Sequence, residues 1–109
     1  VYVFNLALDQ REPTPQVTAR DGSRLASNPY RDPRVREAID LAIDRRALAE
    51  VAMEGLGTPQ AQMVTPGIFG YNPAIRLPEP NVARARQLLA EAGYPNGFRM
   101  PLNFTNNRL

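Results

Sequence analysis

The chain has 109 residues, which is enough for one domain or part of one. Its 43 % hydrophobic residues exclude a disordered composition, and a formal net charge of +2 leaves no large field of one sign. It contains no Cys and no His, which excludes disulfides, the common zinc sites and the usual nucleophile–base pairs within these residues.

Residues 1–8 (VYVFNLAL) are predicted to form a strand, because Val, Tyr and Phe suit a pleated and half-buried surface. Both faces are mostly apolar, which is typical of a strand that is covered on both sides. Asn5 is the polar exception. Its side chain either bonds to neighbouring backbone, which is the interpretation we favour, or projects into a binding cleft.

Residues 9–31 are predicted to be a long loop that contains prolines and an Asp21-Gly22 turn signal. A loop of this length is unusual in a compact domain. Residues 16–19 and 24–26 either pair as a short hairpin across that turn or belong to a mobile loop.

Residues 32–56 are predicted to form two consecutive helices. Asp32 is a candidate N-cap, Pro33 suits the first helical position, and Asp44 is a second candidate cap. Glycines at the end of the range supply a stop. Each helix carries one apolar stripe, made of Val35, Ala38, Ile39, Ala42 and Ile43 in the first and of Leu48, Val51 and Ala52 in the second. Each stripe needs a partner that buries it.

Residues 57–80 are predicted to be a proline-rich connector, because proline prevents a continuous helix. Within this connector, residues 63–71 carry Ile68, Phe69 and Tyr71. These side chains either plug into the core of the domain, which we favour, or belong to a binding loop.

A third helix is predicted over residues 81–93, with Asn81 as its N-cap and with Gly93 and Tyr94 in a Schellman ending. Its apolar stripe consists of Val82, Ala85, Leu88, Leu89 and Ala92. Apolar and polar side chains then alternate over residues 98–105, which predicts a strand with one buried face.

The order strand, loop, helix, helix, connector, helix, strand predicts an α/β (α+β) fold in which three helices pack on a small sheet. The chain begins with Val and shows no signal peptide, so we expect an excised fragment of a longer protein. Such a fragment exposes apolar surface where missing parts packed, and we expect it to self-associate or to be weakly stable.

No residue is expected to be catalytic or to bind a metal. Asp40 and Asp44, four residues apart, are interpreted as part of a solvated charged face rather than a catalytic pair. The two serines have no base to activate them, and no glycine-rich phosphate loop is present. A DNA-binding helix-turn-helix is rejected, because the break before Arg45 is too short and the second helix is partly acidic.

Three stretches carry a resemblance to a known family. They are NPYRDPRVREAIDLAIDRRAL (28–48), EGLGTPQAQMVTPG (54–67) and ARQLLAEAGYPNGF (85–98). This chain resembles the extracytoplasmic solute-binding proteins of peptide- and nickel-type ABC importers, which form family 5 of the bacterial extracellular solute-binding proteins.

The resemblance implies that the chain is a fragment of one lobe of a two-lobed, periplasmic-binding-protein-like fold. It implies a periplasmic or extracytoplasmic protein that captures a solute, most often an oligopeptide or dipeptide, in an interlobe cleft and delivers it to an ABC permease. No cofactor and no nucleic acid are implied, and the membrane is reached only through the permease or a lipid anchor outside this fragment. Arg34, Arg36, Asp44 and Arg45 match the motif as helix-capping and ion-pair positions.

By the same resemblance, residues 1–8 lie near the crossing between the lobes. Tyr2 and Asn5 are therefore the candidate ligand-binding residues. The alternative function is a non-catalytic protein-interaction domain that recognises a partner through an exposed apolar face.

Overall fold

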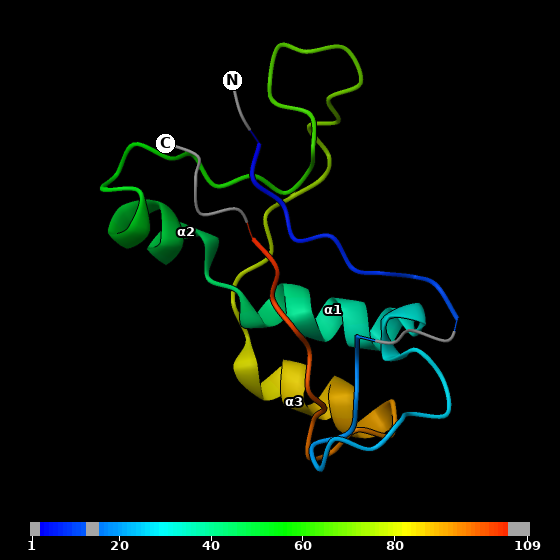
Figure 1. The fold of residues 1–109 in the computed structure, drawn as a ribbon. Coiled ribbons are helices and arrows are strands. Elements are labelled where there is room, and N and C mark those ends of the chain that lie inside the picture. The colour runs from blue at the N-terminus through cyan, green and yellow to red at the C-terminus, as the bar shows by residue number, and fades with distance from the viewer. Residues whose placement is uncertain (1–2, 13–15, 105–109) are drawn as a thin grey trace.

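A computed structural model of the chain describes residues 3–12 and 16–104. Its regular elements are η1 (Pro29–Arg31), α1 (Pro33–Ala42), α2 (Arg45–Ala47), η2 (Leu48–Ala52) and α3 (Val82–Glu91). Figure 1 shows α1 and α3 side by side at one end, with α2 and the long connector at the other. None of the helices in the described part of the chain has the length and hydropathy that crossing a bilayer requires.

The pairing of α1 with α3 is antiparallel, and hydrogen bonds tie both pairs of ends together. At one end the backbone N–H of Asn81 donates to the carbonyl of Leu41 (2.8 Å). At the other end Nη1 of Arg34 donates to the carbonyl of Glu91 (2.9 Å). Both acceptors lie in the last turn of a helix, where carbonyls lack intrahelical partners, so each contact also completes a helix end.

The start of α1 follows from local sequence, whereas its end differs from the predicted stripe, which included Ile43. The Asp32 side chain accepts the N–H of Arg34 (2.9 Å), and Pro33 occupies the first turn. The helix ends at Ala42 because Ile43 is extended (φ −96°, ψ 120°). Because the helix stops there, Asp40 and Asp44 do not lie on one helical face. The sequence pattern had suggested that they would.

The second predicted helix begins where expected but changes its winding. Asp44 accepts the N–H of Ala47 (2.9 Å) and so caps α2. After one turn the chain widens into η2, where the N–H of Met53 donates to the carbonyl of Leu48, five residues back (3.2 Å). Glu54 and Gly55, both with positive φ, end this helical stretch.

The third helix has both predicted caps. The Asn81 side chain accepts the N–H of Arg84 (3.0 Å). At the other end the N–H of Tyr94 donates to the carbonyl of Leu89 (2.7 Å) and Gly93, at φ +97°, donates to Ala90 (3.1 Å). These two bonds make the Schellman ending.

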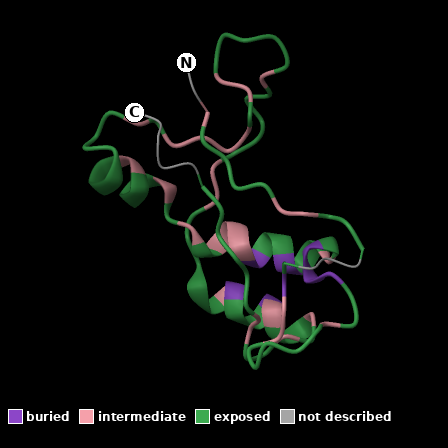
Figure 2. Ribbon diagram, in the orientation of Figure 1, coloured by how far each residue is buried: buried purple, intermediate pink, exposed green. Residues whose placement is uncertain are grey.

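Buried side chains gather on α1 and α3 and on the segments beside them (Figure 2). One cluster joins Val17, Tyr30 and Val35, with Tyr94 and Phe98 packed against it. The ring of Phe98 meets those of Tyr94 and Tyr30 edge-on, at centroid distances of 5.2 and 6.1 Å. The other cluster lies between the two helices and consists of Ala38, Ala85 and Leu88.

The small sheet predicted from the sequence is wrong for the described residues. Residues 3–8 pair with no strand, and residues 98–104 contribute only one isolated antiparallel bridge, between Arg99 and Thr18. A strand exists only where a neighbour completes its ladder of hydrogen bonds, and an alternating pattern cannot supply that neighbour. Residues 1, 2 and 105 of the predicted strands lie outside the described residues.

The hairpin expected within residues 16–26 is reduced to a tight turn. Thr18 and Arg24 form a single antiparallel bridge, and the N–H of Ala19 donates to the carbonyl of Ser23 (2.9 Å). Gly22 adopts φ +89°, which the turn requires. Because Thr18 also bridges Arg99, this turn fastens the last described segment to the α1–α3 core.

Candidate functional site

A groove of about 1050 Å³ lies beside α1, which contributes Arg36, Ile39 and Asp40 to its lining. One wall is the open segment 3–8, and the other walls come from the end of α1, from α2 and η2, and from residues 56–66. Its size is that of a small-molecule site, for which volumes of about 300–1000 Å³ are usual. The groove is therefore the candidate binding surface of this chain.

Of the two predicted ligand-binding residues, the structure describes one. Asn5 is exposed and lines the groove between Phe4 and Leu6. Tyr2 lies outside the described residues.

Three charged side chains line the groove, namely Arg36, Asp40 and Arg45. Nη2 of Arg45 donates to Oδ1 of Asp40, an ion pair that links α1 to α2 across the break at residue 43. Nη1 of Arg45 is buried and has no hydrogen-bond partner among the described residues. Arg36 donates from Nη1 to the carbonyl of Tyr30 (2.9 Å). These arginines therefore act mainly as ion-pair and capping groups, as their place in the motif implied.

Asn28, for which the sequence suggested no role beyond the motif, binds the backbone that directly follows segment 3–8. The Asn28 side chain is buried, and its Nδ2 donates to the carbonyls of Asp9 (2.6 Å) and Arg11 (2.7 Å). Its Oδ1 accepts the N–H of Tyr30 (3.0 Å). Asn28 thus links the end of the groove wall to η1. The Asn-Pro pair before the helix was the sequence signal for its capping role.

Two aspartates, Asp9 and Asp32, have pKa values below the ordinary value for Asp. Hydrogen bonds from the Arg11 side chain lower the pKa of Asp9 to about 2, and those from Arg34 lower the pKa of Asp32. Carboxyl groups of this kind make poor general acids near neutral pH. Among residues 3–12 and 16–104, no group of three metal-ligating side chains comes together.

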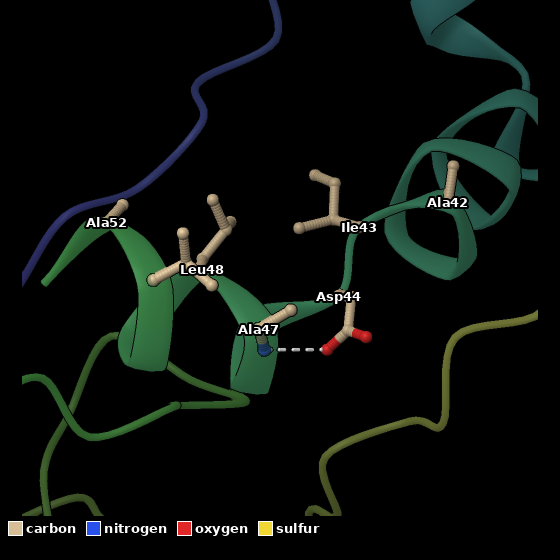
Figure 3. Close-up of a pocket in the computed structure, with 7 residues that line it drawn as sticks. Ala42, Ile43, Asp44, Ala47, Leu48 and Ala52 are labelled. Carbon is tan, nitrogen blue, oxygen red and sulfur yellow. Dashed lines mark hydrogen bonds between the residues drawn. The ribbon is translucent and has the colours of Figure 1, made fainter. Parts of the chain in front are cut away.

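A second, shallower hollow of about 460 Å³ lies against α2 and η2 (Figure 3). Apart from Asp44, its lining is apolar, with Ile43, Leu48 and Val51 as the large members. Asp44 is used by its capping bond to Ala47, drawn as the dashed line in Figure 3. The hollow therefore offers mainly hydrophobic surface, and its one charged side chain already accepts a hydrogen bond through Oδ1.

The loop of residues 62–72 projects from the molecule, at the top of Figure 1. Two hydrogen bonds close its base, since the Gln62 side chain donates to the carbonyl of Asn72 (2.8 Å) and accepts its N–H (3.0 Å). Ile68 and Phe69 are exposed, so the prediction that this loop plugs into the core is wrong for both. The flanking Gly67 and Gly70 have positive φ and turn these side chains away from the core.

Comparison with known proteins identifies the class to which this chain belongs. The sequence profile of "Bacterial extracellular solute-binding proteins, family 5 Middle" matches residues 1–108. The chain therefore belongs to family 5 of the bacterial extracellular solute-binding proteins. This membership agrees with the extracytoplasmic location and the non-catalytic role that the sequence predicted.

Two kinds of relative illustrate the range of this family. Heme-binding protein A of Haemophilus influenzae is 35 % identical over 103 residues, which is 88 % of this chain and 19 % of that protein. The glutathione-binding protein GsiB of Escherichia coli K12 is 41 % identical over 83 residues, which is 76 % of this chain and 16 % of that protein. The chain thus spans less than a fifth of these relatives. No solved structure matches it significantly.

Proposed function

We propose that this chain is part of one lobe of the solute-binding component of an ABC importer. The observation that carries the proposal is the family match over residues 1–108. In this role the parent protein captures a small solute in a cleft between two lobes and hands it to a membrane permease. The lobes close around the ligand, which selects the closed conformation by binding it more tightly.

A short peptide is the solute that we propose, and two features support it. The groove has a volume of about 1050 Å³, and it is lined on one side by segment 3–8, which pairs with no strand among the described residues. Main-chain groups left open in this way can bind the backbone of an extended peptide, with apolar walls receiving its side chains. The similar relatives are named for heme and for glutathione, so the ligand of this chain needs a direct measurement.

Native mass spectrometry of the full-length protein, purified from the extracytoplasmic fraction without refolding, tests this function. We expect a copurified small molecule whose mass is lost on denaturation and which fragments as a peptide. An empty protein that peptides fail to stabilise against heat would contradict the proposal. That outcome would favour the alternative, a non-catalytic protein-interaction domain, to which the exposed apolar side chains around the groove also point.

We further propose that Tyr2 and Asn5 contact the solute. Replacing both by alanine in the full-length protein is expected to raise the Kd about 30-fold, since two lost hydrogen bonds at about 1 kcal/mol each amount to about 2 kcal/mol. Isothermal titration calorimetry with the copurified solute measures the change. The control is Asn96→Ala, which removes an exposed amide in the turn after α3. An unchanged Kd in the double variant would remove both residues from the binding site.

A further inference from the structure

The charged side chains that line the groove do not balance. They are Arg36, Asp40 and Arg45, which together give the lining a formal charge of +1. Asp40 and Arg45 form an ion pair with each other. Arg36 belongs to none of the ion pairs within residues 3–12 and 16–104. Its charge is therefore the one that the described lining leaves uncompensated.

Hydrogen bonds hold the Arg36 side chain at one end of segment 3–8. Its Nη1 donates to the carbonyl of Tyr30 (2.9 Å). The same carbonyl accepts Nε2 of Gln10 (3.1 Å), which also donates to the carbonyl of Leu8, the last residue of the segment (3.3 Å). Arg36 and Leu8 both line the groove. The guanidinium is thus positioned at the Leu8 end of this wall.

Most of the hydrogen-bonding capacity of this guanidinium is free. Arginine carries five N–H donors in a rigid fork, and in the described part of the chain only Nη1 of Arg36 makes a hydrogen bond. The charge of Arg36 helps to lower the pKa of Asp32, but less than the hydrogen bonds from Arg34 do. Those bonds already occupy both oxygens of the Asp32 carboxylate. The Nε and Nη2 edge of Arg36 is therefore open to a group from a ligand.

A carboxylate is the group that fits this edge best. Its two oxygens match two parallel N–H donors of a guanidinium, and such charge-assisted pairs are about twice as strong as neutral hydrogen bonds. Ligand sites usually combine apolar walls with a few placed polar groups that fix orientation. The groove has this form, since Leu8 and Ile39 line it together with Arg36.

From these observations we propose that Arg36 is the carboxylate anchor of the groove, where it binds the C-terminal carboxylate of the peptide solute. The peptide backbone then lies along segment 3–8, whose main-chain groups pair with no strand among the described residues. This inference rests on the proposed function and narrows the solute to peptides with a free C-terminus.

Isothermal titration calorimetry on the solute-free full-length protein tests the anchor with two probes, trialanine and trialanine amide, which differ only in their C-terminal group. We expect trialanine to bind about tenfold more tightly, since only it offers a charged acceptor. This preference is expected to be lost in Arg36→Gln. Arg36→Lys keeps the charge without the fork, so we expect it to retain about threefold.

The matched control is Arg86→Gln, which removes an exposed arginine of α3 that lies outside the groove and in none of the described ion pairs. It should keep the full preference for trialanine. The comparison of the two probes on the unmodified protein needs no substitution, so it remains decisive even where a variant fails to fold.

Three results would overturn the proposal, and they separate it from the proposed function. Equal Kd values for the two probes on the unmodified protein would leave peptide binding in place and remove the carboxylate anchor. An undiminished preference in Arg36→Gln would assign the anchor to another residue. Binding of neither probe would contradict the peptide function itself, and the anchor with it.

Discussion

Replacing Asn28 by alanine is expected to destabilise the protein by about 3 kcal/mol, because three hydrogen bonds of a buried side chain are lost at about 1 kcal/mol each. The carbonyls of Asp9 and Arg11 lose their donor, and the N–H of Tyr30 loses its acceptor. Urea-induced unfolding measures the loss. The control Asn96→Ala, at an exposed turn, should change stability by less than about 0.5 kcal/mol.

The variant Asn28→Asp separates the hydrogen bond that the Asn28 side chain accepts from the two that it donates. It keeps an oxygen for the N–H of Tyr30 but loses both donors, and it places a carboxylate beside two carbonyls and the Glu12 side chain. We expect it to be at least as unstable as the alanine variant. A loss below about 1 kcal/mol in both variants would mean that Asn28 is not the anchor of the groove wall.

Leu88→Ala is expected to cost about 2–5 kcal/mol, since the truncation leaves a cavity between α1 and α3. Leu88 is only 2 % exposed and packs with Ala38 and Ala85, whose small side chains cannot refill the space. Val82→Ala, on the exposed first turn of the same helix, is the matched control and should change stability little. Equal losses in the two variants, measured by urea unfolding, would contradict the α1–α3 interface.

The losses of stability expected for the Asn28 and Leu88 variants also bear on ligand binding. Leu88 holds together the rigid unit of α1 and α3, while Asn28 fastens the groove wall to that unit. A ligand that closes two lobes requires walls whose positions are set before binding, since each flexible segment adds an ordering cost. We therefore expect the anchor at Asn28 to matter for affinity as well as for folding.

The starts of α1, α2 and α3 and the end of α3 were predictable because local chemistry decides them, whereas the break at Ile43, which the predicted stripe had included in the first helix, was not. Asp32, Asp44 and Asn81 each accept a backbone N–H from the first turn, and Gly93 provides the left-handed residue of the Schellman ending. These interactions involve residues two to five apart in sequence. The amino-acid pattern therefore contains all the partners that they need.

The stripes and strands were only partly predictable, because burial requires a distant partner. Val35 and Leu88 carry the same kind of helical pattern as Val51, yet the first two are buried and Val51 is exposed. The difference is that α1 and α3 lie against each other, whereas η2, which carries Val51, packs among the described elements only on α2, the turn before it. Segment 3–8 likewise has the composition of a strand without the paired neighbour that a strand requires.

The candidate site was likewise only partly predictable from the sequence. The motif from residue 28 to residue 98 was sufficient to recognise the family, and the absence of His and Cys excluded the common zinc sites and the usual nucleophile–base pairs within these 109 residues. Only the tertiary structure brought Asn5 to the wall of a groove with Arg36 and Arg45, and only it revealed Asn28 as the anchor. The reason is physical: caps and composition are properties of neighbouring residues, whereas a groove exists only after chain segments far apart in sequence have packed.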